Sequence, residues 1–337
     1  MVMKQLPKKK RCQSRFFFYY CLIIVDIKSK VGYSRDSIKI KGAIMIYEIL
    51  LAIVVAGIIF ACLLLLYIHY ENKQFRLTHY TYSSEKLPKA FDGSKLLFLS
   101  DLHGYEYGER NSKLIEAIDK EHPDFILIGG DMFVKGPNFD GRVALELIKE
   151  LSKKYPIYYA NGNHELRVSL LPETKKSTYV EYIDALSSYG VKYLVNDGVS
   201  IEKAGEVIRI VGLNLPELYY SKFKKVNLSN NILKEQIGVA DEKTFTILLA
   251  HNPSYFEEYS RWGADMVLSG HVHGGMIALP FVGGVISTQG WLFPKYDFGE
   301  FHLGASTMYL SRGLGNHTIN VRINNRAEAV VIHLKNR

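Results

Sequence analysis

Residues 95–103 read Lys-Leu-Leu-Phe-Leu-Ser-Asp-Leu-His, and residues 125–131 read Phe-Ile-Leu-Ile-Gly-Gly-Asp. In both stretches a short apolar run, typical of a buried strand, ends in side chains that can bind a metal ion. Three further apolar runs, Ile157–Ala160, Phe245–Ala250 and Met266–Leu268, are predicted strands that lead into Gly162-Asn163-His164-Glu165, Ala250-His251 and Gly270-His271-Val272-His273. Because α/β sheets build their sites where strands end, the five segments together predict one site, that of a hydrolase with two metal ions.

Amphipathic helices are predicted between these strands. Apolar residues recur with helical spacing over Asn111–Glu121, Arg142–Lys154 and Val180–Tyr189. After these helices the apolar pattern predicts shorter strands, at Tyr193–Val195, Val199–Glu202, Val207–Val211, Met308–Ser311 and Val330–Leu334. Alternating strands and helices followed by further strands predict an α/β fold with two sheets.

The segment Ile49–Tyr67 holds nineteen residues without a charge. About 20 apolar residues are needed to cross the hydrocarbon core of a bilayer as a helix. A cleavable signal peptide would have a shorter apolar region followed by small residues, and the segment after Tyr67 offers no such site. We therefore expect an uncleaved transmembrane helix over residues 45–70, between a basic tail (1–44) and a catalytic domain (71–337).

The positive charge of the chain is concentrated before this segment. Residues 1–44 hold eleven Lys or Arg and two acidic residues, whereas the remainder holds 31 basic and 32 acidic side chains. No nucleic-acid partner is therefore expected for the domain. The flanking charge predicts a cytoplasmic N-terminus, a single pass through the cell membrane and an extracytoplasmic domain. Initiation at Met45 would remove most of that charge and weaken or reverse the prediction.

Cysteine usage excludes two kinds of stabilisation. Cys12, Cys21 and Cys62 all precede residue 70. The predicted catalytic domain therefore contains neither a disulfide nor a cysteine-ligated zinc.

Carboxylate, amide and imidazole ligands suit divalent Mn, Fe or Zn. In a two-metal site the ions lie about 3.5–4 Å apart, and a carboxylate can bridge them. A water held between the ions loses a proton near neutral pH, and the resulting hydroxide attacks the phosphorus. A histidine close to the metals can supply a proton to the leaving alkoxide.

The order Asp-x-His, Gly-Gly-Asp, Gly-Asn-His-Glu, a lone His and Gly-His-x-His resembles that of the calcineurin-like metallophosphoesterase family. The match runs from about Lys95 to His273. The segments Ser-Asp-Leu-His-Gly, Gly-His-Val-His-Gly-Gly and Ser311-Arg312-Gly313-Leu314-Gly315 are similar to those of the membrane-anchored bacterial branch of this family. The resemblance to this branch extends the match to nearly residue 335. The resemblance implies a four-layer αββα sandwich.

The same resemblance implies a ligand set. One metal would be held by Asp101, His103, Asp131 and His273, and the second by Asp131, Asn163, His251 and His271. Asp131 would bridge the two ions, and His164 would be the catalytic proton donor, oriented by its neighbour. The chain departs from the branch at Met276, where we expect Gln, and at Ala327, where Pro is common; neither is a predicted ligand.

Three further features have more than one interpretation. Glu165 is expected to fix the orientation of a ligand histidine, with a catalytic role as the alternative. Arg312 is either a surface arginine or a phosphate-binding residue. The apolar loop Gly290–Pro294 is expected to pack in the core, although beside a membrane anchor it could instead rest on lipid or hold an acyl chain.

The sequence therefore predicts a membrane-tethered hydrolase of phosphate mono- or diesters. The tether suggests a lipid-linked or envelope substrate. The alternatives are a nucleotide phosphodiesterase or nuclease on the same fold, and a metal-binding scaffold without activity. Nothing in the sequence settles the oligomeric state.

Overall fold

The computed structural model describes residues 35–135, 140–316 and 320–337. It divides into two compact units, one ending at Leu65 and one from Leu66 to Arg337, and each is described by itself. Most of the predicted basic tail lies outside the described residues.

The first unit contains most of the helix α2, which runs from Arg35 to Asn72. Its segment Lys39–Asn72 is long and apolar enough to cross a membrane, and the most apolar window of that segment is not buried by the rest of the chain. At 1.5 Å per residue a 38-residue helix is about 57 Å long, which exceeds the roughly 30 Å hydrocarbon core of a bilayer. The helix therefore has the length and composition of the predicted anchor.

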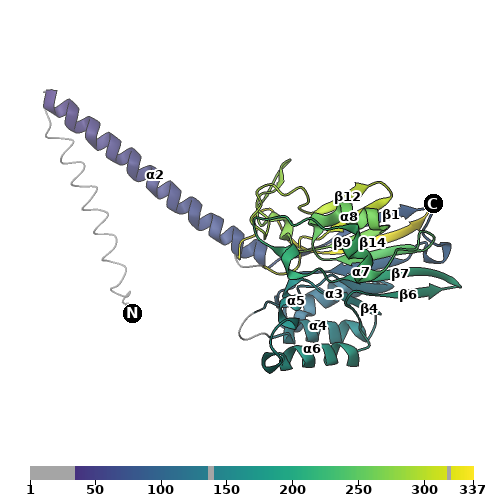
Figure 1. Cartoon of the computed structure of the whole chain (residues 1–337). Helices are drawn as coiled ribbons and strands as arrows, with labels where there is room; N and C mark the ends of the chain where they lie inside the picture. Colours follow the sequence, from purple (N-terminus) through teal and green to yellow (C-terminus); the bar gives the residue numbers. More distant parts are fainter. Residues whose placement is uncertain (1–34, 136–139, 317–319) are drawn as a thin grey trace, which may run out of the picture. The chain divides into compact units, whose positions relative to one another are not determined.

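The second unit is built on two six-stranded sheets (Figure 1). The strand order of the first sheet is β1-β14-β2-β3-β4-β5, with bounds Phe75–Ser84 (β1), Ala327–Asn336 (β14), Lys95–Leu99 (β2), Phe125–Ile128 (β3), Ile157–Ala160 (β4) and Lys192–Leu194 (β5). Strands β2 to β5 are parallel, β14 is antiparallel to β2, and β1 is parallel to β14.

The second sheet has the order β12-β13-β9-β8-β7-β6, with bounds Gly299–Leu303 (β12), Ser306–Leu310 (β13), Met266–Ser269 (β9), Phe245–Ala250 (β8), Glu206–Leu213 (β7) and Asp197–Lys203 (β6). Its four central strands are parallel and its two edge strands are antiparallel to their neighbours. A short hairpin pairs Ala278–Leu279 (β10) with Gly283–Gly284 (β11).

Helices cover the outer faces of the two sheets. The α-helices of this unit are Ser112–Glu121 (α3), Arg142–Ser152 (α4), Asn163–Ser169 (α5), Ser177–Ser188 (α6), Asn230–Ile237 (α7) and Phe256–Trp262 (α8). Single 3₁₀ turns lie at Lys89–Phe91, Glu109–Asn111, Glu173–Lys175, Glu217–Tyr220, Pro253–Tyr255 and His273–Gly275.

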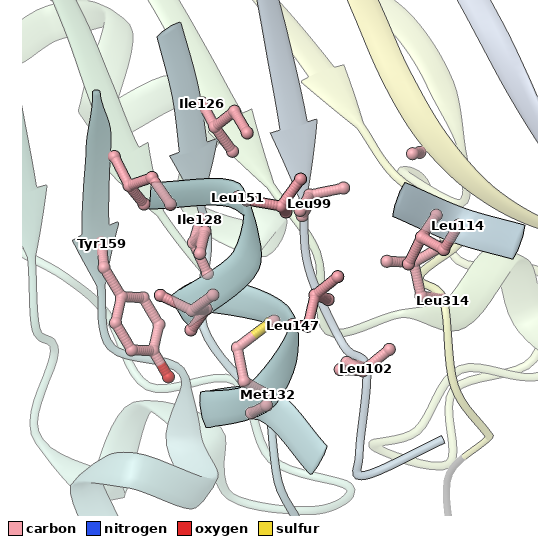
Figure 2. Close-up of a cluster of buried hydrophobic side chains, with 14 of the residues drawn as sticks. Leu99, Leu102, Leu114, Ile126, Ile128, Met132, Leu147, Leu151, Tyr159 and Leu314 are labelled. Atoms are coloured by element: carbon pink, nitrogen blue, oxygen red, sulfur yellow. The ribbon is translucent and has the colours of Figure 1, made fainter. Parts of the chain in front are cut away.

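Three apolar clusters join the helices and the two sheets into four layers. One lies between the first sheet and helices α3, α4 and α6, where Leu147 and Leu151 of α4 pack on Leu99 and Ile128 (Figure 2). A second combines side chains from both sheets, and a third joins the second sheet to α7 and α8. The predicted αββα sandwich is therefore confirmed.

Most predicted elements are found within a few residues of their expected bounds, and β3, β4 and β8 match exactly the ranges read from their apolar runs. Strands β1, β10, β11 and β12 and helices α5, α7 and α8 were not predicted. In β1 the side chains are mostly half-buried and polar or aromatic, so the segment carries no apolar run. Its partner β14 lies 252 positions later in the sequence, as in the pairing Phe75↔Ala327.

Candidate active site

The five predicted segments converge at the ends of strands from both sheets. Asp101 follows β2, Asp131 follows β3, Asn163 begins α5 after β4, His251 follows β8, and His271 and His273 follow β9. All the predicted ligands are buried, with exposed fractions of 9% or less. The two sheets thus bring together side chains that are up to 172 positions apart in the sequence.

Together with His164, the predicted ligands form overlapping groups that could hold metal ions. The groups are Asp101-His103-His273, His103-Asp131-His164 and Asp131-His251-His271, each with ligand atoms within 4.8 Å of one another. His273 Nε2 lies 3.2 Å from Asp101 Oδ1, and His251 Nε2 lies 3.2 Å from Asp131 Oδ2. Asp131 belongs to two groups and its Oδ2 lies 4.0 Å from His103 Nε2, so its carboxylate stands between the two halves of the cluster.

Backbone carbonyls fix two of the imidazole rings. His251 Nδ1 lies 2.7 Å from the carbonyl oxygen of Gly129, and His273 Nδ1 lies 3.2 Å from that of Gly315. Because a carbonyl only accepts, each Nδ1 carries the proton when the ring is neutral. Each Nε2 atom then carries the lone pair of the ring, which can bind a metal ion, and it faces the carboxylates.

Electrostatics in the cluster couple the carboxylates to the imidazoles. Burial alone would raise the pKa of Asp101, but the neighbouring His273 and His251 outweigh it and lower that pKa. Burial would lower the pKa of His251, but Asp131 and Asp101 outweigh it and raise that pKa to about 10. Burial, and then the neighbouring His251, hold the pKa of His271 well below its usual value.

Five of the predicted ligands have left-handed backbones, with positive φ at Asp101, His103, Asp131, His271 and His273. The i, i+2 spacing of His271 and His273 predicts that both side chains lie on one face of an extended segment, and this prediction is wrong. Strand β9 ends at Ser269, and the φ angles of the two histidines are 73° and 52°. Gly270 lets the carboxylate of Asp101 approach the backbone closely, because a Cβ at that position would collide with it.

His164 lies beside the cluster, with Nε2 3.9 Å from Asp131 Oδ2. The backbone N–H of Lys135 donates to His164 Nδ1 over 2.8 Å. Since that nitrogen accepts, the proton of the neutral ring is on Nε2, the atom nearer the cluster. Burial lowers the pKa of His164, which keeps the ring neutral. Lys135, rather than the expected neighbour Glu165, therefore sets the tautomer.

Glu165 is fully buried and organises the turns that carry the ligands. Its Oε2 accepts from the backbone N–H groups of Asp131 (2.8 Å) and Gly162 (3.0 Å). Its Oε1 accepts from the N–H of Met132 (2.9 Å) and the hydroxyl of Tyr159 (2.7 Å). The carboxylate thus joins the loop after β3 to the start of α5, and among the described residues it accepts no hydrogen bond from a ligand histidine.

The donor set fits a divalent metal. Within the described part of the chain, the buried atoms Asn163 Oδ1 and His271 Nε2 have no hydrogen-bond partner. Buried polar atoms are rarely left without one, and both belong to the set predicted to hold the second metal. Oxygen and imidazole donors in one buried cluster are typical of Mn, Fe or Zn sites.

A cleft of about 400 Å³ opens above this cluster. It is lined by the predicted site residues Asn163, His164 and His271, together with Tyr220, Thr288 and Gln289. The basic residues Lys135, Arg167 and Lys222 also line it, and Arg167 pairs with Glu217 over 3.0 Å. The cleft can therefore admit an anionic group directly to the predicted ligands.

Arg322 was not singled out from the sequence, although it holds the loop that contacts the cluster. Its buried guanidinium donates to the carbonyls of Arg312, Gly313, Gly315 and Asn325, over 2.6–3.1 Å. The Gly315 carbonyl is the partner of His273. No local pattern marks Arg322, because its contacts depend on how a loop turns back on itself.

Arg312 matches neither of its two interpretations. It is buried, its Nη1 donates to Asn325 Oδ1 over 3.0 Å, and its guanidinium stacks 3.3 Å from the ring centroid of Phe298. Its backbone N–H donates to Glu328. Arg312 therefore stabilises the loop and does not line the cleft.

The expectation that Gly290–Pro294 packs in the core is also wrong. Trp291, Leu292 and Phe293 have exposed fractions of 41%, 64% and 56%. A short antiparallel bridge between Ile286 and Leu292 holds the loop, and the N–H of Phe293 donates to the Val285 carbonyl over 2.9 Å.

A two-sheet sandwich with an Asp/His cluster at its strand ends defines a metal-dependent hydrolase, and the comparisons give the family. The model of the calcineurin-like phosphoesterase family matches residues 94–275, which is more than half of the chain. The chain therefore belongs to that family, which is metal-dependent and acts on phosphoesters.

Curated relatives include two bacterial proteins. The chain is 27% identical over 270 residues to the uncharacterized metallophosphoesterase YkuE of Bacillus subtilis, covering 79% of this chain and 87% of YkuE. It is 27% identical over 246 residues to the phosphodiesterase YaeI of Escherichia coli, covering 71% of this chain and 82% of YaeI. A zebrafish transmembrane protein with a metallophosphoesterase domain is 26% identical, over 74% of this chain and 55% of that protein.

Among solved structures, the phosphopantetheinyl hydrolase PptH of Mycobacterium tuberculosis aligns with a TM-score of 0.39 at 16% identity. The alignment covers 65% of this chain and 89% of PptH.

Proposed function

We propose that this chain hydrolyses phosphoesters with two divalent metal ions held by the seven predicted ligands. One ion would be held by Asp101, His103, Asp131 and His273, and the other by Asp131, Asn163, His251 and His271. The observation that carries the proposal is the set of overlapping ligand groups, in which Asp131 stands between the two halves. When bound, such ions activate a water molecule and offset the charge on the phosphate oxygens.

The protein's own residues would position the ester and its leaving group. The phosphate would enter the cleft lined by Lys222 and Arg167, which offset its charge. His164 would donate its Nε2–H to the leaving oxygen, because the Lys135 N–H keeps the proton on that nitrogen. Full protonation of the ring would require Nδ1 to give up the bond from Lys135.

The test uses the full-length chain in detergent, stripped of metal and then supplied with Mn²⁺, Fe²⁺ or Zn²⁺. Bis-p-nitrophenyl phosphate and p-nitrophenyl phosphate would distinguish diesterase from monoesterase activity. Asp131→Asn should lose bound metal and turnover, whereas His164→Ala should keep the metal and lose turnover. Asp184→Asn, an exposed acid on α6, is the matched control. A folded protein that binds no metal would contradict the proposal and favour a scaffold.

We also propose that α2 spans the cell membrane and that the domain is extracytoplasmic, which would bring lipid-linked phosphoesters within reach. The length and apolar composition of the helix support the first part, and the basic residues before it support the second. Val239 is 70% exposed, so Val239→Cys in a chain lacking Cys12, Cys21 and Cys62 offers one accessible thiol. Labelling of intact cells by an impermeant maleimide would support this topology, and labelling only after lysis would contradict it.

A further inference from the structure

A second groove adjoins the cleft above the predicted metal ligands. It has a volume of about 320 Å³, and Gln289 lines both the groove and the cleft. Val272, which lies between His271 and His273 in the sequence, forms part of its wall. Pockets that bind small molecules begin at about 300 Å³, so the groove can hold part of a ligand whose other end lies in the cleft.

One continuous part of the groove wall is apolar. The consecutive side chains of Trp291, Leu292 and Phe293 line it, together with Tyr255 and Pro294. The loop that carries them is closed by hydrogen bonds from the Ser287 N–H to the Trp291 carbonyl (2.9 Å) and from the Trp291 N–H to Ser287 Oγ (3.1 Å). The backbone therefore holds three large apolar side chains in partial contact with water, which has a cost unless a ligand covers them.

Four polar side chains in the same wall, those of Ser287, Gln289, Glu257 and Lys295, already have partners within the protein. Ser287 Oγ accepts from Trp291, Gln289 donates to the Ser221 carbonyl over 3.3 Å, and Glu257 pairs with Lys295 at 2.5 Å. A sugar or a base would need such groups for its own hydrogen bonds. A hydrocarbon chain would not, so the engaged polar groups favour an apolar occupant.

Positive charge borders the groove and the cleft. Lys222 lines the cleft and Lys224 and Lys225 line the groove, and all three are exposed. No ion pair is found for these lysines among the residues that the structure describes. The surface is thus complementary to a molecule with an anionic head and an apolar tail, and the same chain carries a helix with the composition of a membrane span.

We propose that this groove binds the hydrocarbon chain of an amphiphilic phosphoester whose phosphate lies in the adjoining cleft. The inference rests on the proposed function, because it assigns a substrate class to that site. It makes Trp291, Leu292 and Phe293 residues that select the substrate.

The test is a chain-length series measured on the full-length protein in nanodiscs. The substrates are p-nitrophenyl alkyl phosphodiesters from methyl to octyl, or the corresponding alkyl phosphates if the enzyme prefers monoesters. Complete burial of a methylene group corresponds to about a fourfold gain in binding. A groove that is open on one side should give about half of that free energy, or roughly twofold per methylene. Seven methylenes should then raise kcat/KM about 100-fold from methyl to octyl.

The variants assign this preference to the groove. Leu292→Ser combined with Phe293→Ser should reduce the octyl-to-methyl ratio of kcat/KM from about 100 to below 10, and Leu292→Ala should have an intermediate effect. Val239→Ser removes an exposed apolar side chain that does not line the groove, and should keep the wild-type ratio. Partition of the esters into the nanodisc is common to all four proteins, so it cancels from the comparison.

Each outcome has a definite meaning. A wild-type enzyme that hydrolyses the methyl ester with no preference for longer chains would overturn the inference and leave the proposed function intact. An equal chain-length preference in the wild type and the double variant would also overturn it, because the preference would then come from the bilayer. Absence of hydrolysis of every ester with every metal would refute the proposed function, and the inference with it.

Discussion

Replacing Glu165 by Gln tests whether one buried carboxylate holds the two ligand-bearing turns together. The substitution keeps the size of the side chain and turns one oxygen acceptor into an NH₂ donor. In the wild type the two oxygens accept from three backbone N–H groups and from Tyr159. Burial, and then the charge of Asp131, raise the pKa of Glu165 to about 7, so the comparison is made at pH 8.5, where the wild type carries the carboxylate.

The magnitude follows from the orientation of lowest cost. If the amide oxygen faces Asp131 and Gly162, the NH₂ group faces the Met132 N–H and the Tyr159 hydroxyl. The hydroxyl can turn toward Tyr182, whose own hydroxyl lies 3.2 Å away, but the Met132 N–H loses its acceptor. An orphaned buried donor costs about 1–3 kcal/mol, and the remaining bonds lose their charge assistance. We expect a loss of about 2–4 kcal/mol in the free energy of unfolding.

The assay is chemical denaturation of the metal-free full-length protein, monitored by tryptophan fluorescence, with metal content measured separately. Tyr159→Phe is the control, because it removes the hydroxyl that bonds Glu165 and Tyr182 without orphaning a backbone group, and it should cost about 1–2 kcal/mol. A Glu165→Gln variant whose unfolding free energy is within 0.5 kcal/mol of the wild type would refute the reasoning. So would a cost no larger than that of Tyr159→Phe.

Three further predictions concern the cluster and the loop beside it. Asp131 and Asp101 outweigh burial and raise the pKa of His251 to about 10, so a metal ion must displace the proton of His251 in order to bind. Metal affinity should therefore rise about tenfold per pH unit from pH 7 to 9. Calorimetry in buffers of different ionisation enthalpy should detect at least one released proton; a pH-independent affinity would contradict this. Arg322→Met should leave several carbonyls without a donor, including that of Gly315, and weaken metal binding by about 10–100-fold; metal titration with unchanged affinity would show that the loop holds His273 without it. His164→Ala should lower kcat by about 10²–10⁴-fold with little change in bound metal, and a variant that loses both together would indicate a ligand instead of a donor.

The parts of the fold that sequence could predict are those with a strong local pattern. The apolar runs Phe125–Ile128 and Phe245–Ala250 are bounded by turns and polar residues, so their ends coincide with the ends of β3 and β8. Strand β1 has no such run, because its pairing with β14 at the sheet edge leaves most of its side chains half-buried. Its position depends on a partner that no local window contains.

The candidate site divides in the same way. The predicted ligands could be found because each follows a strand and carries a metal-binding side chain. The roles of Glu165 and Lys135 could not be predicted, since their hydrogen bonds join segments that are distant in the sequence. The role of Arg322 was missed because it depends on how its own loop turns back on itself. The left-handed backbones of His271 and His273 were also missed, because the i, i+2 spacing was taken to mean an extended segment. The sequence therefore shows which side chains can bind the metals, but it does not show which groups orient them.

The position of β14 has a consequence for how the protein is made. The last strand of the chain lies between the first two, pairing in parallel with β1 from Phe75↔Ala327 to Ser84↔Asn336 and antiparallel with β2. During synthesis β1 and β2 are available early, but the strand that separates them is completed only at residue 336. Until β14 has been made, β1 and β2 lack the strand that pairs with both, and a stop codon before β14 would leave both without their shared neighbour.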